Sequence, residues 1–152
     1  MLVLLVEDNP AEARLTQEAL RETGFKHDLQ IVSDGEMATQ YLRREREFGS
    51  APTPSLILLD LNLPRKHGRE VLHEIKTDPQ LAFIPVIVVS NSRAFDDINE
   101  VYRLQGNCYL TKSPDLDEFF ASIRSLAEFW LNHVQLPNAE EIEGHPSLPF
   151  PV

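Results

Sequence analysis

Residues 56–64 read Leu56-Ile57-Leu58-Leu59-Asp60-Leu61-Asn62-Leu63-Pro64, and this stretch decides the fold. Four consecutive apolar residues after a proline-rich segment are typical of a short strand buried on both faces, as in a parallel sheet. A second apolar run, residues 2–6, ends in Glu7-Asp8. Parallel strands present their carboxyl ends at one edge, so three acidic side chains are expected to meet there. Because such carboxylates repel one another unless a cation lies between them, the sequence predicts a hard-metal site.

Composition limits the class of protein. The 152 residues suit one domain and leave no room for a second. Lysine and arginine number 14 against 24 acidic residues, and the net charge of −10 argues against DNA, RNA or anionic lipid as the main partner. With the single cysteine, Cys108, and no apolar leader or membrane-length apolar run, we expect a cytoplasmic protein whose partners are proteins and metal ions.

Apolar runs alternate with helical patterns along the chain. Strands are expected at residues 2–6, 29–32, 56–59, 85–90 and 108–112. Helices are expected around residues 11–20, 37–42, 71–75, 93–104 and 115–134. This alternation predicts a doubly wound α/β fold, flavodoxin-like, with a five-stranded parallel sheet of order 2-1-3-4-5 and five helices on its two faces. Residues 1–134 form the domain, and the acidic, proline-rich residues 135–152 are predicted to be an extended tail.

The predicted strand order brings an acidic group, a hydroxyl and an amine to one edge of the sheet. Asp60 follows the third strand, Ser90 ends the fourth and Lys112 ends the fifth. A carboxylate beside Mg²⁺ can attack phosphorus and form an acyl phosphate. The metal, Lys112 and the Ser90 hydroxyl would then hold the phosphoryl oxygens, while the backbone carbonyl of Asn62 can reach the same ion.

These motifs also belong to a known family. They are Glu7-Asp8, Asp60 with Asn62, Pro64 and Gly68 after it, Ser90, and Tyr109 three residues before Lys112. Over residues 2–134 the chain resembles the receiver domain of two-component response regulators, the CheY-like family. The resemblance implies a signalling phosphoacceptor that catalyses only its own phosphotransfer and dephosphorylation, and is otherwise not an enzyme.

The resemblance also implies roles for single residues at the metal site. Asp60 would accept a phosphoryl group from a sensor histidine kinase. Asp8 would bind Mg²⁺ directly, Glu7 would bind it through a water, and the Asn62 backbone carbonyl would complete the protein ligands. Mn²⁺ is a possible substitute for Mg²⁺ as the cofactor.

Three further positions correspond to the family's switch and to its phosphate-binding lysine. Ser90 stands where the family has the serine or threonine that moves to bind the phosphoryl group. Tyr109 stands at the aromatic switch, and Lys112 at the invariant lysine. Phosphorylation is expected to shift a two-state population through these groups.

Two departures from the family pattern are visible. Ser113 separates Lys112 from Pro114, where the family has proline directly after the lysine, so the usual cis peptide is in doubt. The segment between Leu42 and Ser55 is longer than in minimal receivers. Together with a long last helix, these features resemble the small stand-alone regulators that serve bacterial, especially cyanobacterial, phytochrome kinases.

The apolar stripe of the last helix is broader than a sheet face requires. We therefore predict a two-fold homodimer through the fourth and fifth helices, the strand between them and the last segment of the chain. Its interface residues would be Tyr109, Phe119, Phe129, Trp130 and Val134. The alternative is that the proline-rich tail folds back over these residues.

Other functions fit the motifs less well. A haloacid-dehalogenase-type phosphatase also forms an aspartyl phosphate, but it needs paired aspartates after the first strand, where this chain has one. A flavodoxin-like FMN-binding protein needs a phosphate-cradling loop there, and Glu7-Asp8 would repel phosphate without a cation. A degenerate receiver that binds partners without phosphorylation is a further alternative.

Overall fold

The computed structural model describes residues 1–144, with the backbone alone at 143 and 144, and it contains one five-stranded sheet. All strand pairs are parallel and the order is β2-β1-β3-β4-β5, which confirms the predicted topology. The strands are β1 (Leu2–Val6), β2 (Asp28–Val32), β3 (Leu56–Leu59), β4 (Val86–Ser90) and β5 (Cys108–Thr111).

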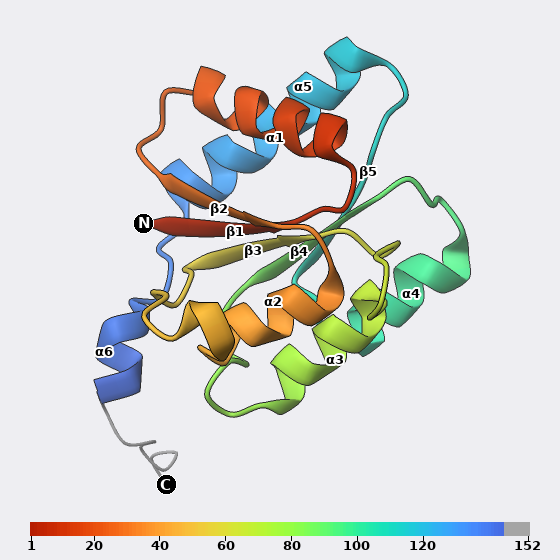
Figure 1. Cartoon of the computed structure of the whole chain (residues 1–152). Coiled ribbons are helices and arrows are strands. Elements are labelled where there is room, and N and C mark those ends of the chain that lie inside the picture. The colour runs from red at the N-terminus through yellow and green to blue at the C-terminus, as the bar shows by residue number, and fades with distance from the viewer. Residues whose placement is uncertain (145–152) are drawn as a thin grey trace, which may run out of the picture.

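Helices cover both faces of the sheet. The α-helices are α1 (Pro10–Glu22), α2 (Gly35–Leu42), α3 (Gly68–Thr77), α4 (Phe95–Arg103), α5 (Leu116–Ala127) and α6 (Ala139–Gly144). Figure 1 shows α1 and α5 on one face and α2, α3 and α4 on the other. A short 3-10 turn, η1 (Arg46–Phe48), lies in the long segment after α2. Among residues 1–144, no helix is both long enough and apolar enough to span a bilayer.

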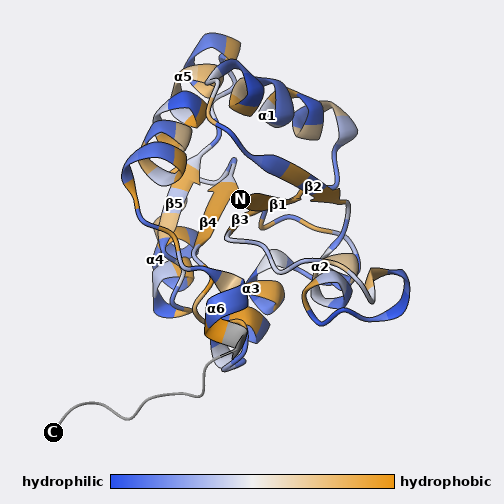
Figure 2. Cartoon of the chain, turned by 90° about the vertical axis from the view of Figure 1, so that its left-hand side faces the viewer, coloured by the Kyte–Doolittle hydropathy of each residue, from blue (hydrophilic) through white to orange (hydrophobic). Residues whose placement is uncertain are grey.

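Burial of the central strands on both faces explains their apolar runs. All four residues of β3 are at most 1% exposed. Ile57 and Leu59 contribute to the core under α2, α3 and α4, whereas Leu56 and Leu58 contribute to the core under α1 and α5. Figure 2 shows these hydrophobic strands between helices whose outer sides are largely hydrophilic. A sheet buried on both sides leaves only its strand ends accessible to a ligand.

Side-chain caps fix where the helices begin. Asn9 accepts hydrogen bonds from the backbone N–H groups of Ala11 and Glu12, at 2.9 and 3.2 Å, and Pro10 occupies the first turn of α1. The cap of α3 is His67, whose Nδ1 accepts from the Arg69 N–H at 3.1 Å. The helices therefore start close to the strand ends, where the acidic residues lie.

The end of the chain differs from the prediction in two places. The expected single helix over residues 115–134 is α-helical only to Ala127 and continues as a π-helical turn, η2 (Glu128–His133). The expected extended tail contains a short helix, α6, because residues 138–144 lack proline and Asn138 accepts from the Glu140 N–H at 3.2 Å. Residues 145–152 of the predicted tail lie outside the described residues.

Candidate functional site

Four neighbouring strands end at the same level and present the site. Backbone hydrogen bonds hold their ends in register: the Asp60 N–H donates to Val6 O at 3.1 Å, and the Lys112 N–H donates to Ser90 O at 2.7 Å. The side chains that follow β1, β3 and β5 therefore converge, although they are far apart in sequence. The strand order alone had predicted this convergence.

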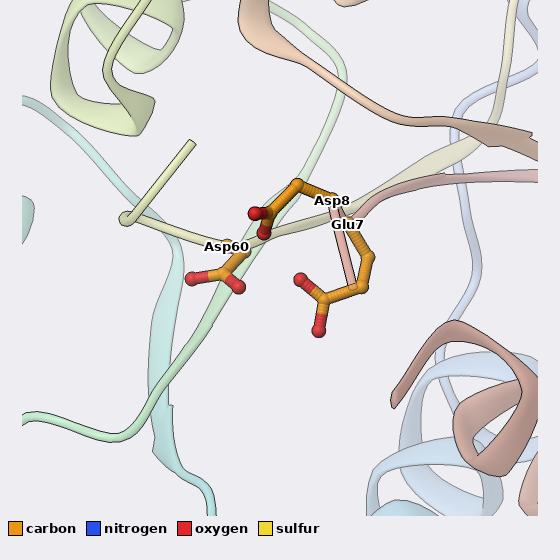
Figure 3. Close-up of side chains that lie close together, drawn as sticks. All are labelled: Glu7, Asp8 and Asp60. Atoms are coloured by element: carbon orange, nitrogen blue, oxygen red, sulfur yellow. The ribbon is translucent and has the colours of Figure 1, made fainter. Parts of the chain in front are cut away.

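Three carboxylates form an acidic cluster at this edge (Figure 3). Glu7, Asp8 and Asp60 each offer one oxygen, and these atoms lie within 4.8 Å of one another. Asp8 is exposed, whereas Glu7 and Asp60 are 4% and 8% exposed. The buried Glu7 Oε2 has no hydrogen-bond partner among residues 1–144. An unpartnered carboxylate oxygen inside a cluster of acids fits an oxygen-binding divalent cation.

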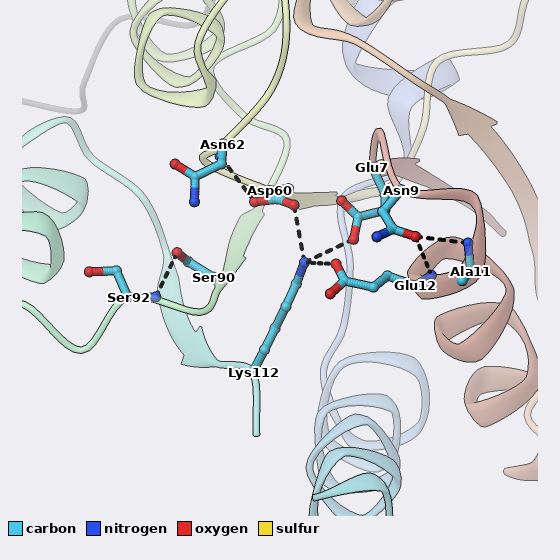
Figure 4. Close-up of polar contacts among 9 residues, drawn as sticks. All are labelled: Glu7, Asn9, Ala11, Glu12, Asp60, Asn62, Ser90, Ser92 and Lys112. Carbon is cyan, nitrogen blue, oxygen red and sulfur yellow. Dashed lines mark hydrogen bonds and ion pairs between the residues drawn. The ribbon is translucent and has the colours of Figure 1, made fainter. Parts of the chain in front are cut away.

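The ammonium of Lys112 lies among the acids (Figure 4). Its Nζ donates to Glu7 Oε1 at 2.8 Å, to Glu12 Oε2 at 2.8 Å and to Asp60 Oδ2 at 3.0 Å. Asp60 Oδ1 accepts from the Asn62 N–H at 3.0 Å. Both oxygens of Asp60 are therefore held in place by this chain's own donors.

Burial and neighbouring charges shift the pKa values of these groups. Burial, then the nearby Asp60 and Glu12 carboxylates, which would accept a hydrogen bond from the protonated form, raises the pKa of Glu7 to about 9. Burial lowers the pKa of Lys112, but its hydrogen bonds to Glu12 and Glu7 and the charge of Asp60 raise it by more, so the net pKa lies above the ordinary value. The lysine is therefore charged over the whole physiological range.

A close contact of backbone sets the position of Asp60. A Cβ added to Gly68, the first residue of α3, would lie 2.3 Å from the backbone oxygen of Asp60 and 2.6 Å from Leu61 Cα. Only glycine fits there, because both neighbours are backbone atoms. The Gly68 N–H donates to Leu61 O at 2.9 Å, which closes the turn between β3 and α3.

A hydrogen-bond network extends from the site towards α4. Ser90 is fully buried, and its Oγ accepts from the Ser92 N–H at 3.2 Å. The Tyr109 hydroxyl donates to Ser92 O at 2.7 Å, and the Ser92 hydroxyl donates to Asp97 Oδ2 at 2.5 Å. Asp97 also pairs with Arg69 of α3. We call Ser92, Asp97, Arg69 and Tyr109 the Ser92 network.

The sequence prediction included Tyr109 but missed Glu12 and the other three members of the Ser92 network. Glu12 lies one helical turn after Asp8 in the first turn of α1, and this spacing was the signal that could have identified it. Ser92 and Asp97 lie in a loop and at an exposed helix start, where no periodic pattern points to them. All peptide bonds of the described residues are trans, including those of Ser113 and Pro114.

The predicted dimer residues differ in exposure. Phe129 is 50% exposed, and Tyr109, Trp130 and Val134 are half-buried. Phe119 is only 7% exposed and packs in the core under α1 and α5, so it does not offer a contact surface. Phe129 and Trp130 line an open groove of about 650 Å³, together with residues that include Cys108, Leu110 and Leu126.

Comparison with known proteins assigns the family. The model of the response regulator receiver domain matches residues 3–124. The response regulator Rcp1 of Synechocystis is 48% identical over 138 residues, which cover 91% of this chain and 94% of that protein.

Two solved structures share the fold. The Mn²⁺-bound form of Rcp1 has a TM-score of 0.87 at 47% identity, and the match covers 90% of this chain and 99% of that one. The structure of the phosphorylated cyanobacterial phytochrome response regulator RcpA has a TM-score of 0.87 at 51% identity. The match covers 90% of this chain and 98% of that one. These matches favour the receiver interpretation over the phosphatase and flavodoxin alternatives. The chain belongs to the response regulator receiver domain family.

Proposed function

We propose that this response regulator accepts a phosphoryl group on Asp60 from a sensor histidine kinase and signals through protein contacts. One observation carries the proposal: the Asp60 carboxylate lies 3.0 Å from the Lys112 ammonium and beside the unpartnered Glu7 oxygen. A carboxylate held between a fixed cation and a metal-binding cluster is arranged to become an acyl phosphate.

The transfer needs only this chain's residues, the cation and the phosphorylated kinase. A carboxylate oxygen of Asp60 attacks phosphorus, the P–O bond forms, and the P–N bond to the kinase histidine breaks with its electron pair going to the ring nitrogen. Lys112 and the Ser90 hydroxyl bind the phosphoryl oxygens. Hydrolysis of the same acyl phosphate by water ends the signal, and the protein acts on no other substrate.

The acidic cluster would hold the cation. We assign Asp8 and Asp60 as direct ligands, Glu7 as a ligand through water, and the Asn62 carbonyl as the last protein ligand. Mg²⁺ is the proposed ion and Mn²⁺ a substitute, which the Mn²⁺-bound structure of Rcp1 supports. Bound there, the cation would offset negative charge on the phosphoryl oxygens.

The switch would couple the site to a partner surface. Ser90 and Tyr109 are its two residues, and they already share Ser92 as a hydrogen-bond partner. Movement of Ser90 towards a phosphoryl group would disturb the carbonyl that the Tyr109 hydroxyl contacts. The population of tyrosine positions would then report phosphorylation.

A phytochrome-type kinase is the proposed partner. RcpA, 51% identical, is described as a phytochrome response regulator, which supports this pairing. We further propose that residues 1–134 form the receiver, that it acts in the cytoplasm, and that it forms a homodimer through α4, β5, α5 and the last segment. The exposed Phe129 and its neighbouring groove support the dimer.

Acetyl phosphate with Mg²⁺ tests the phosphoacceptor directly. The wild-type protein should gain one phosphoryl group by intact mass, and a borohydride trap should locate it at Asp60. Asp60→Asn should prevent labelling, because an amide oxygen is too weak a nucleophile. Undiminished labelling of Asp60→Asn would place the chemistry at another residue.

A further inference from the structure

We propose that Glu12 is a positioning residue for Lys112: it holds the ammonium in the unphosphorylated protein and releases it to the arriving phosphoryl group. The inference rests on the proposed function, because it concerns how that same site is set. Glu12 belongs neither to the acidic cluster of Glu7, Asp8 and Asp60 nor to the residues that the family resemblance identified.

The hydrogen-bond count at Lys112 requires one bond to be given up. An ammonium has three N–H donors. Here they meet Glu7, Glu12 and Asp60 at 2.8, 2.8 and 3.0 Å. No N–H is therefore left for a phosphoryl oxygen. Lys112 can bind that oxygen only by leaving one of these three carboxylates.

Exposure shows which carboxylate can leave at the lowest cost. The side chains of Glu7 and Asp60 are 3% and 9% exposed, whereas that of Glu12 is 35% exposed. A buried carboxylate that loses its partner keeps the full cost of desolvation, but a carboxylate at the surface is rehydrated. Glu12 is therefore the partner that exchanges Lys112 for water.

The start of α1 fixes Glu12 in reach of the lysine. Asn9 accepts from the Glu12 N–H at 3.2 Å, so the backbone of Glu12 is part of the helix cap. From this position its carboxylate faces the Lys112 ammonium across the edge of the sheet (Figure 4). The contact joins α1 to the end of β5, which are 100 residues apart in sequence.

Removal of Glu12 should make phosphoryl binding easier. In Glu12→Ala, one N–H of Lys112 is free from the start. We expect acetyl phosphate labelling of Asp60 to be about fivefold faster, and beryllofluoride, a phosphoryl analogue, to bind about fivefold more tightly with Mg²⁺. This factor corresponds to ~1 kcal/mol, in the range for a partly exposed charged hydrogen bond.

Three variants separate the contact from the charge. Glu12→Gln keeps the length of the side chain without its charge and should give a smaller increase in rate. Glu12→Asp keeps the charge but is one methylene too short for the contact, so it should behave like Glu12→Ala. Glu18→Gln is the control, because it removes the same charge about 9 Å along α1. Glu18 has no side-chain ion pair or hydrogen bond in the described part of the chain, in contrast to Glu12. Wild-type values are therefore expected for Glu18→Gln.

A double variant and a spectrum complete the test. In a Lys112→Ala background, removal of Glu12 should change beryllofluoride affinity no more than Glu18→Gln does. The ¹⁹F spectrum of bound beryllofluoride should be the same for wild type and Glu12→Ala, because Glu12 no longer contacts Lys112 in the loaded state. Circular dichroism of each variant confirms folding, and Glu12→Gln, the most conservative change, serves if the alanine variant unfolds.

Several outcomes would overturn the inference. They are equal rates in wild type and Glu12→Ala, an equal gain in Glu18→Gln, a full effect in the Lys112→Ala background, and a displaced ¹⁹F resonance in Glu12→Ala. Each leaves the function of Asp60 intact as long as the wild-type protein is labelled there. Absence of labelling in the wild type would instead remove the proposed function itself.

Discussion

Binding of a divalent cation to the acidic cluster is predicted to displace a proton from Glu7. Burial, followed by the nearby Asp60 and Glu12 carboxylates that would accept a hydrogen bond from the protonated form, raises the pKa of Glu7 to about 9. Without a cation the carboxyl is therefore protonated at pH 7. A cation beside Asp8 and Asp60 favours the ionised form of Glu7, so proton and cation compete for the cluster.

The size of the effect follows from the distance between pH and pKa. At pH 7 the pH lies about two units below the Glu7 pKa, and each unit corresponds to about 1.4 kcal/mol. Cation affinity should then be about 100-fold below its high-pH limit. The sign is fixed by the raised pKa: affinity rises up to tenfold per unit between pH 7 and 9 and levels off above, where the carboxyl is already ionised.

Calorimetry measures both quantities. Mg²⁺ titrations in two buffers of different protonation enthalpy count the protons released, and a series from pH 6.5 to pH 9.5 gives the slope. Glu7→Gln, which carries no ionisable group, should release no proton and show a flat profile, while Glu18→Gln should keep the wild-type slope. A wild-type affinity independent of pH, or an unchanged slope in Glu7→Gln, would refute the reasoning.

Three further predictions concern stability and assembly. Gly68→Ala should destabilise the protein by about 1–3 kcal/mol in urea and slow labelling of Asp60, because its Cβ would lie 2.3 Å from backbone; wild-type behaviour would contradict the contact. His67→Asp should raise the free energy of unfolding, measured in urea, by roughly 0.5–1 kcal/mol, since aspartate is a better helix cap and its charge suits the N-terminus of α3; a lower free energy of unfolding would show that His67 is needed for another reason. Phe129→Asp should leave stability nearly unchanged but give a monomer in sedimentation at micromolar concentration. A wild-type protein that is already monomeric at that concentration would contradict the predicted dimer.

The sheet and the main acidic residues were predictable because they depend on patterns in short stretches. Apolar runs such as residues 56–59 can be satisfied only by burial on both faces, and a parallel sheet is the arrangement that supplies it. Once the strand order is given, Glu7, Asp60 and Lys112 are expected at one edge of the sheet, since they follow β1, β3 and β5 in the row β1-β3-β4-β5. The prediction of convergence therefore needed no knowledge of side-chain conformation.

The rest depended on three-dimensional detail. The contact between Glu12 and Lys112 needs the direction in which α1 leaves β1, and Asn9 sets that direction through its cap. Phe119 was assigned to a surface because the helical stripe is broad, but α1 packs against α5 and covers it. Helix α6 formed where acidic composition had suggested an extended tail, since local capping outweighed composition.

The Ser92 network has a consequence for partners that bind near α4. Ser92 is held through its carbonyl by Tyr109 and through its hydroxyl by Asp97, which Arg69 anchors to α3. Suppose that phosphorylation of Asp60 changes the affinity of α4 for a partner protein by some factor. By thermodynamic linkage, binding of that partner then changes the phosphorylation equilibrium of Asp60 by the same factor. The downstream target would thus help to set the fraction of the protein that is phosphorylated, in addition to receiving the signal.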